Sequence, residues 1–326
     1  MSSEKLIEIK DLHTHFYTEA GTAKAVDGVS FDIYKGEVLG IVGESGTGKS
    51  VTSLSINRLI PNPPGKIVSG EIIYNGINLL DLSYEEMRDY RGKDISMIFQ
   101  EPMTSLNPVL KISVQMNEVL MRHLGLSFEE ATKKSVDMLR AVGIPDPEDR
   151  INEYPHQFSG GMRQRVMIAM SLLCNPSLLI ADEPTTALDV TIQAQILDLM
   201  ISLKEKREGA AILLITHDLA VIAETCDRVI VMYGGKVQEI ATVEELFKNP
   251  LHPYTKALMD SIPKMDQKVE RLNALKGMVP SILDMPVGCK FCTRCDFVED
   301  KCMDTEPELI EVKEGHFVRC KPEILK

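Results

Sequence analysis

One loop near the N-terminus has the residue types and the spacing of a phosphate-binding site. Residues 43–50 read Gly-Glu-Ser-Gly-Thr-Gly-Lys-Ser, between an apolar run, Val38–Val42, and a stretch, Val51–Leu59, that we expect to be helical. Glycines let successive backbone N–H groups converge on phosphates, and the helix dipole adds positive potential. Lys49 would neutralise the β/γ-phosphates, and the Ser50 hydroxyl would ligate Mg²⁺. The predicted nucleotide-binding residues are Gly43, Ser45, Gly46, Thr47, Gly48, Lys49 and Ser50.

A pair of carboxylates follows a second apolar run. Leu178–Ala181 reads as a buried strand, and Asp182 and Glu183 come directly after it. Ligands of open α/β sheets bind at the carboxyl ends of strands, so these side chains can face the phosphates. Asp182 is suited to hold Mg²⁺ through water, and Glu183 to orient or deprotonate an attacking water. The alternative interpretation is that the pair only caps the next element.

A second anion-binding helix end is expected at Ser159-Gly160-Gly161, where a helix opens after Phe158. One such end on the core and another on a helical insert suggest a dimer that clasps ATP between its subunits.

The elements that position these residues change character along the chain. The first hundred residues are rich in expected strands, residues from about 105 to 175 are expected to be helical, and strand–helix alternation follows from Leu178 to Tyr233. That alternation indicates an α/β fold with a parallel sheet and helices on its faces. Capping-box patterns at Ser83 and Ser127 predict helix starts. The predicted domains are residues 1–264 for nucleotide binding and residues 265–326 for a small cysteine-rich module. The expected early strands are Leu6–Ile9, Val29–Ile33, Val38–Val42, Glu71–Tyr74 and Ile95–Phe99.

Composition narrows the class of protein. The chain has 326 residues, 26% charged and 44% hydrophobic, an ordinary globular balance. Its net charge of −12 argues against a broad nucleic-acid-binding face. The N-terminus lacks the layout of a signal peptide, so we expect a cytoplasmic protein. Seven cysteines are present, five of them after residue 288, and in a reducing compartment such a cluster favours metal binding over disulfides.

Taken together and in order, the motifs resemble the ATP-binding subunits of ABC transporters over most of residues 5–250. Two departures occur in the signature motif, where Phe158 and Met162 replace the family's leucine and glutamine. The matches are Gly43–Ser50 (Walker A), Gln100 (Q-loop), Ser159-Gly160-Gly161 (signature), Asp182-Glu183 (Walker B), Ala187-Leu188-Asp189 (D-loop) and His217 (switch histidine).

This resemblance implies a P-loop NTPase (RecA-like) core, a helical subdomain insert at about 105–175 and an N-terminal antiparallel β subdomain. It implies ATP held between the Walker A loop of one subunit and the signature helix of its partner, with Asp189 also at the nucleotide. Glu183 would be the general base, His217 would contact the γ-phosphate, and Gln100 would share Mg²⁺ with Ser50. Phe16 is the predicted adenine-stacking aromatic, with Tyr17 second.

The C-terminal cysteines leave alternatives open. Cys289, Cys292 and Cys295 form a C-x-x-C-x-x-C pattern that by itself favours an iron–sulfur cluster, and a four-cysteine Zn²⁺ site is the alternative. His252–Leu258 and Val279–Cys289 resemble the tail of dipeptide/oligopeptide importer ATPases. That resemblance implies a [4Fe–4S] cluster, structural first and redox-sensing second, without Cys292. Its ligands would be Cys289, Cys295, Cys302 and Cys320.

The importer resemblance implies an ATPase subunit that energises dipeptide/oligopeptide import at the cytoplasmic face of the cell membrane. The implied partners are a second, identical or paralogous ATP-binding subunit, two transmembrane permeases and, indirectly, an extracytoplasmic peptide-binding protein, with no nucleic acid. The rival hypothesis is a soluble ABC-type ATPase whose zinc module acts in nucleic-acid repair or translation. The acidic balance and the lack of a second ATP-binding half count against it.

Overall fold

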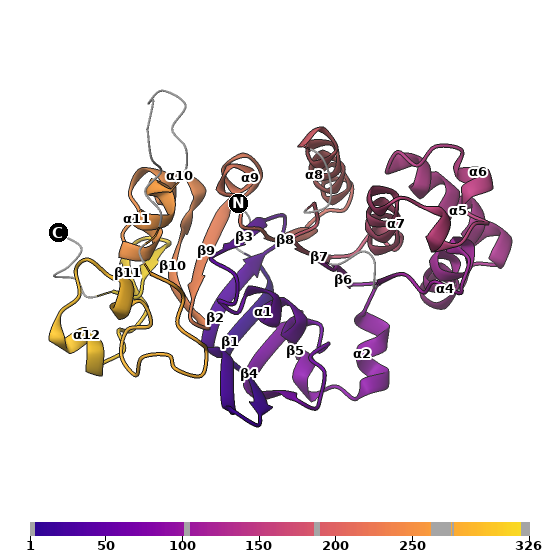
Figure 1. Cartoon of the computed structure of the whole chain (residues 1–326). Helices are drawn as coiled ribbons and strands as arrows, with labels where there is room; N and C mark the ends of the chain where they lie inside the picture. Colours follow the sequence, from indigo (N-terminus) through magenta and orange to yellow (C-terminus); the bar gives the residue numbers. More distant parts are fainter. Residues whose placement is uncertain (1–3, 101–104, 186–189, 262–274, 276, 321–326) are drawn as a thin grey trace. The chain divides into compact units, whose positions relative to one another are not determined.

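The computed structural model describes residues 4–100, 105–185, 190–261, 275 and 277–320 (Figure 1). These residues form two compact units. The first consists of residues 4–6, 33–37 and 81–215, and the second of residues 7–32, 38–80 and 216 onward. Within the described ranges, no helix combines the length and the apolar character that crossing a membrane requires.

The first unit is built on parallel strands in the order β8-β7-β6. β6 (Ile95–Ile98), β7 (Leu178–Asp182) and β8 (Ala211–Ile215) are buried along their whole length. Continuous apolar runs of this kind belong to strands that are covered on both faces. α7 (Gly160–Leu172) packs against β6, and α8 (Val190–Glu205) connects β7 with β8. Asp182 therefore stands at the carboxyl end of a buried strand, as predicted.

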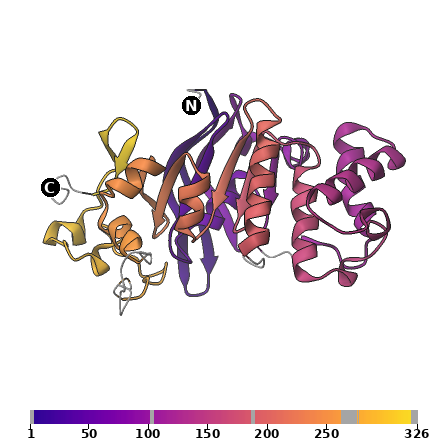
Figure 2. The same cartoon turned by 90° about the horizontal axis from the view of Figure 1, so that it is seen from above.

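Helices make up the rest of the first unit, and Figures 1 and 2 show α4 to α7 gathered in one group. Both predicted capping boxes are present, because Ser83 and Ser127 each accept the backbone N–H of a glutamate three residues on. α4 packs on α5, and α5 packs on α7. The bounds are α2 (Tyr84–Tyr90), α4 (Ile112–Leu124), α5 (Phe128–Ala141), α6 (Pro147–Arg150) and the 3₁₀ turn Pro155–Gln157.

The second unit contains a mixed set of strands in the order β11-β12-β10-β9-β3. β3 (Val38–Val42) runs parallel to β9 (Arg228–Tyr233), and β10 (Lys236–Thr242) returns antiparallel to β9. β12 (His316–Val318) and β11 (Ile310–Lys313) extend this edge, with Ile240 opposite Phe317. The helices are α1 (Lys49–Ile56), α9 (Leu219–Thr225), α10 (Val243–Lys248), α11 (Pro253–Asp260) and α12 (Asp300–Asp304), with 3₁₀ turns at Leu79–Asp81 and Cys292–Arg294.

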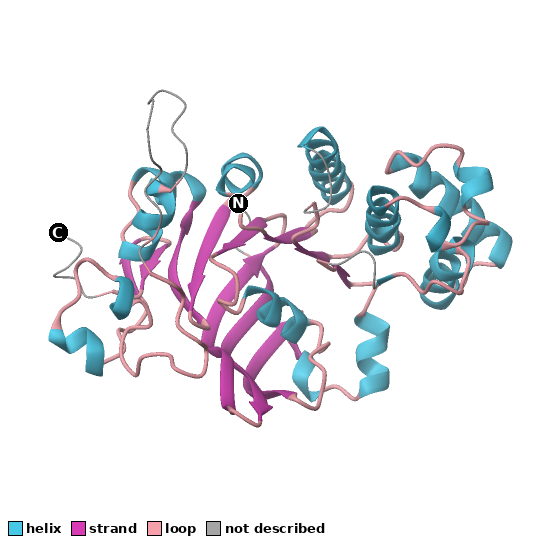
Figure 3. Cartoon of the chain, viewed as in Figure 1, coloured by secondary structure: helices cyan, strands magenta, loops and turns pink. Residues whose placement is uncertain are grey.

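A four-stranded antiparallel sheet in the order β2-β1-β4-β5 completes the fold (Figure 3). β1 (Lys5–Thr18) and β2 (Gly21–Tyr34) are much longer than the apolar runs that predicted them. Their added residues are mostly polar or partly exposed, so the hydrophobic pattern did not mark them as strand. β4 (Gly65–Tyr74) pairs with β1, and β5 (Ile77–Asn78) closes the edge.

The cysteine-rich segment shares the core of the second unit. Phe291 is buried against Tyr233 and Tyr254, with ring centroids 5.3 Å and 5.2 Å apart. The same cluster holds Val231 from β9 and Leu246 from α10. This segment therefore has a core, which it forms by packing on β9 and α11.

We expect the second unit to lose stability in acid, because His252 is buried in it. His252 caps α11, accepting the Tyr254 N–H on Nδ1 at 3.0 Å, and burial lowers its pKa to about 4, partly opposed by Glu239. Because the unfolded chain binds this proton near pH 6.5, the stabilisation is complete above that pH and is lost as pH falls toward 4. Between pH 7.5 and 5 we expect the wild type to lose about 2 kcal/mol more unfolding free energy than His252→Asn, which keeps the cap.

Urea unfolding followed by circular dichroism at each pH measures this difference. His156→Asn, at an exposed histidine, is the matched control and should follow the wild type. Parallel pH profiles for the wild type and His252→Asn would contradict the assignment.

Candidate functional site

The phosphate-binding loop joins β3 to α1 in the second unit, which is the strand–loop–helix context the motif requires. α1 begins at Lys49 with Gly48 as its N-cap, and no side chain caps its first turn. The N-terminal N–H groups of such a helix can therefore serve a bound anion. Lys49 is only 5% exposed, whereas Ser50 is partly exposed.

Two of the loop glycines are required by their surroundings. Gly43 has φ 152°, and a Cβ there would lie 2.3 Å from the Met232 carbonyl oxygen. Gly48 has φ 100°, and a Cβ there would lie 2.4 Å from the Ala25 carbonyl oxygen. Both contacts are with backbone, so no side chain can move aside to make room. Glycine is thus the residue that lets this loop close on its neighbours.

Inside the loop, backbone carbonyls hold the polar side chains. Lys49 Nζ donates to the carbonyl oxygens of Gly43 at 2.8 Å and Glu44 at 2.9 Å. Thr47 Oγ1 donates to the same Glu44 oxygen at 2.8 Å. A phosphate would offer Nζ a charged acceptor, which makes a stronger hydrogen bond than a neutral carbonyl. The loop therefore holds its lysine cation at the start of α1.

Phe16 lies on β1, opposite Gly65 of β4, and is partly exposed. A Cβ on Gly65 would lie 2.9 Å from Phe16 Cε1, so the glycine makes room for the ring. Tyr17 is 51% exposed. Either ring is accessible for stacking on a base, and the position of the Phe16 ring is the more closely fixed because the ring packs against Gly65.

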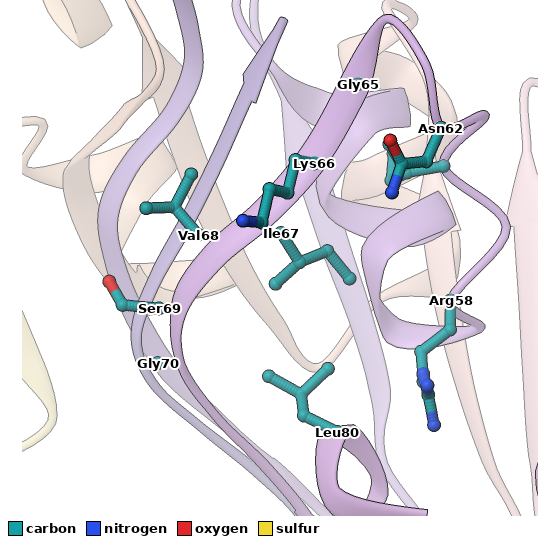
Figure 4. Close-up of a pocket in the computed structure, with 10 residues that line it drawn as sticks. Arg58, Asn62, Gly65, Lys66, Ile67, Val68, Ser69, Gly70 and Leu80 are labelled. Atoms are coloured by element: carbon teal, nitrogen blue, oxygen red, sulfur yellow. The ribbon is translucent and has the colours of Figure 1, made fainter. Parts of the chain in front are cut away.

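A pocket of about 440 Å³ lies along β4 beside this position (Figure 4). None of its lining residues is a carboxylate or a histidine, and none belongs to the predicted nucleotide site, so we assign it no chemistry. It is lined by Arg58, Ile60, Asn62, Gly65, Lys66, Ile67, Val68, Ser69, Gly70 and Leu80.

In the first unit, the structure brings Gln100 and Glu183 together. Gln100 Nε2 donates to Glu183 Oε2 at 3.0 Å. Glu183 has φ 47°, a left-handed conformation that costs a non-glycine residue about 1–3 kcal/mol and that clusters at functional sites. Its N–H donates to Ile215 O at 2.9 Å, while Asp182 before it is only 3% exposed. The two carboxylates thus differ in their surroundings. Asp182 is buried at the end of β7, whereas Glu183 is partly exposed and accepts a hydrogen bond from the Gln100 side chain.

Ser159 is the N-cap of α7, and its hydroxyl accepts the Met162 N–H at 3.3 Å. Ser159 and Gly160 are exposed, and a Cβ on Gly160 would meet no atom within 4 Å. An uncovered helix N-terminus with Gly160 and Gly161 in its first turn can receive an anion. Met162 provides the backbone donor, so the family's glutamine is not needed for this cap.

The remaining predicted residues are placed as follows. His217 is exposed in the second unit, in a short turn where the Asp218 N–H donates to Thr216 Oγ1 at 3.0 Å. Asp218 then caps α9. Asp189, with Ala187 and Leu188, lies outside the described residues, as do residues 101–104 after Gln100.

The cysteines converge within the second unit. The Cys289 N–H donates to Cys302 O at 2.9 Å, and Cys292, Cys302 and Cys320 are buried. Burial raises the pKa of Cys289 to about 12, and the neighbouring thiols of Cys320, Cys292 and Cys295 add to the rise. Burial likewise raises the pKa of Cys295, and Cys302 adds to it. These thiols thus influence one another, but among the residues that the structure describes no three of them have sulfur atoms that all lie within 4.8 Å of one another.

A group that could hold a metal ion, His13, His15 and Asp27, lies outside the predicted sites and has ligand atoms within 4.8 Å of one another. His13 lies between two carboxylates, 3.2 Å from Asp27 and 3.1 Å from Asp11, and Lys236 Nζ lies 3.4 Å from Asp27. His13 and Asp27 thus already pair with each other and with neighbouring charged groups, and we assign no metal to this group.

Sequence reasoning missed the residues that hold Glu44, the second residue of the loop. Arg294 and Tyr254 both contact it, although they lie 250 and 210 residues away in the chain. The only signal was the position of Arg294 beside Cys295 in the cysteine motif.

Family models and known relatives match most of this chain. The family model "ABC transporter" matches residues 26–186, and the model "Oligopeptide/dipeptide transporter, C-terminal region" matches residues 238–302. The chain is 53% identical to the oligopeptide transport ATP-binding protein AppD of Bacillus subtilis, over 97% of this chain and 96% of the relative. It is 50% identical to the dipeptide transport ATP-binding protein DppD of the same organism, over 97% and 94%.

Solved structures give the same fold. The dimeric, post-hydrolysis ATP-binding cassette MJ0796 bound to ADP and Pi has a TM-score of 0.66 and 29% identity, covering 73% of this chain and 98% of that chain. The predicted P-loop fold with an antiparallel β subdomain is confirmed. The expectation of a purely parallel sheet is wrong at one edge, where β10, β12 and β11 pair antiparallel. The rival nucleic-acid hypothesis finds no support among these matches. The chain belongs to the ATP-binding subunits of peptide ABC transporters and is an ABC-type ATPase.

Proposed function

We propose that the chain hydrolyses ATP to drive the import of dipeptides or oligopeptides through membrane permeases. The observation that carries this proposal is the match of residues 238–302 to the oligopeptide/dipeptide transporter C-terminal region, added to an ABC cassette. Relatives at 50–54% identity over nearly the whole chain are peptide, oligopeptide or dipeptide transport ATP-binding proteins.

In this proposal the loop and the carboxylates divide the chemistry. Lys49 and the loop amides bind the β/γ-phosphates, and Phe16 stacks on adenine. Glu183 takes a proton from the attacking water, its orientation held by the 3.0 Å contact with Gln100. His217 contacts the γ-phosphate. Ser50, Gln100 and Asp182 would hold Mg²⁺, which when bound neutralises phosphate charge.

A second ATP-binding subunit would complete each site, with Ser159-Gly160-Gly161 and Asp189 of one chain facing the nucleotide of the other. The exposed N-terminus of α7 suits that role. ATP binding would close the dimer and hydrolysis would reopen it. We place the assembly at the cytoplasmic face of the membrane, beneath two permeases that receive peptide from an extracytoplasmic binding protein.

For the cysteines we propose a [4Fe–4S] cluster held by Cys289, Cys295, Cys302 and Cys320, with Zn²⁺ as the alternative. The backbone hydrogen bond from the Cys289 N–H to the Cys302 carbonyl joins the two stretches that carry the thiols, and it supports a common site. Because Phe291 already packs in the core, the cluster would fix the irregular chain around it rather than create the fold.

Uptake of a labelled oligopeptide by the native host tests the proposed transport. A strain lacking this chain should take up little peptide, and the wild-type chain should restore uptake while Glu183→Gln should not. Unchanged peptide uptake in the deletion strain, with loss of uptake of another solute, would refute the cargo assignment and leave the ATPase intact.

A further inference from the structure

The phosphate-binding loop is held from outside by the cysteine-rich segment. Arg294 makes two hydrogen bonds to the Glu44 carboxylate, Nη1 to Oε2 at 2.6 Å and Nη2 to Oε1 at 3.1 Å. The Arg294 side chain is 3% exposed and that of Glu44 is 29% exposed. A two-point arginine–carboxylate pair that is largely shielded from water fixes both position and orientation of the carboxylate.

Glu44 connects this pair to the interior of the loop. Its N–H donates to the Tyr254 hydroxyl at 2.8 Å, and its carbonyl accepts from Lys49 Nζ and Thr47 Oγ1. The side chain, the amide and the carbonyl of one residue are thus all engaged, and the carbonyl bonds reach the lysine that binds phosphate.

The partners of Glu44 are themselves held by aromatic packing. Arg294 lies 5.7 Å from the Tyr233 ring and 5.9 Å from the Phe291 ring, and it also donates to the Tyr233 hydroxyl at 3.3 Å. Tyr233 and Tyr254 contact each other with centroids 4.8 Å apart. All three rings belong to one buried hydrophobic cluster, so the surroundings of the arginine are rigid.

We infer that Arg294 is a positioning residue for the phosphate-binding loop, through which the cysteine-rich segment sets the affinity for ATP. This inference rests on the proposed ATP site at Gly43–Ser50. Loss of the arginine releases the loop and leaves the Glu44 carboxylate unpaired near the phosphates. Both effects weaken ground-state binding and leave the residues proposed for water activation unchanged.

Equilibrium binding and hydrolysis of ATP by the full-length chain test the inference. Arg294→Gln should weaken ATP binding by about ten- to a hundredfold and raise KM to match, with kcat within about twofold. Arg294→Lys keeps the charge but lacks the planar guanidinium group, so its ATP affinity should lie between those of the wild type and Arg294→Gln. Glu44→Gln should lose less ATP affinity than Arg294→Gln, because no unpaired anion remains. In the double variant, Glu44→Gln should restore part of the affinity that Arg294→Gln loses.

Three variants separate this role from general destabilisation. Arg319→Gln removes an arginine of the same segment that bonds Val237 O and Pro307 O, and it should leave ATP affinity unchanged. Tyr254→Phe keeps the ring but removes the acceptor of the Glu44 N–H, and should weaken binding about threefold. If Arg294→Gln does not fold, the ATP affinity of Tyr254→Phe tests the inference in its place. Wild-type affinity in both Arg294→Lys and Tyr254→Phe, or an equal loss in Arg319→Gln, would overturn the inference.

Lys49→Ala distinguishes this inference from the proposed site itself. If the wild type binds ATP and Lys49→Ala does not, the site stands and the Arg294 series tests only the positioning role. If Lys49→Ala binds ATP normally, the proposed site fails and the inference falls with it.

Discussion

Replacing Glu183 by glutamine should lower steady-state ATP hydrolysis by about a hundredfold or more while ATP still binds. Glutamine keeps the size of the side chain and an oxygen that can accept from Gln100 Nε2, so the local geometry is expected to survive. It cannot take a proton from water. A backbone at φ 47° already supports a non-glycine residue here, and glutamine adds no branching at Cβ.

With hydrolysis blocked, the closed dimer should accumulate in ATP. Size-exclusion chromatography with and without ATP, beside a phosphate-release assay, measures both effects. Glu148→Gln, at an exposed glutamate of α6 paired only on the surface with Arg140, is the matched control and should behave as wild type. Turnover within a few-fold of wild type in Glu183→Gln would refute the general-base assignment.

Cys302→Ser should abolish binding of the proposed metal group, and Cys292→Ser should retain it. Cys302 is 6% exposed, and its carbonyl accepts the Cys289 N–H. The stretch around Cys302 therefore lies beside the stretch that begins at Cys289. A hydroxyl there replaces a soft thiolate with a poor ligand for iron. Iron should fall from about four atoms per chain to below one in Cys302→Ser.

Metal analysis and a visible spectrum on anaerobically purified protein measure this. Because both cysteines are buried, the two variants are matched for burial and differ in the ligand role we assign. The reverse outcome would exclude the proposed ligand set. About one zinc per chain and no colour in the wild type would replace the cluster with the zinc alternative.

Local patterns predicted the elements that carry the motifs. The runs at Val38–Val42, Leu178–Asp182 and Ala211–Ile215 became fully buried strands because strands covered on both faces need continuous apolar sequence. Ser83 and Ser127 began helices through their own hydrogen bonds. In such places the residues that determine the structure are neighbours in the chain.

Features built from distant residues were not predictable in this way. The full length of β1 depends on pairing with β4, where His15 lies opposite Lys66 although neither belongs to an apolar run. The bond from Arg294 to Glu44 joins residues 250 positions apart, and no spacing rule connects them. The loop and the cysteine motif could each be identified from the sequence, but their contact through Arg294 and Glu44 is seen only in the folded structure.

Peptide-dependent ATP hydrolysis by the assembled transporter in membrane vesicles tests the central claim most directly. Vesicles from the native host, with this chain supplied as wild type or Glu183→Gln, would be assayed with and without oligopeptide and its binding protein. The account predicts hydrolysis that rises with peptide and is lost in Glu183→Gln. Hydrolysis that depends on this chain but is indifferent to peptide would contradict it.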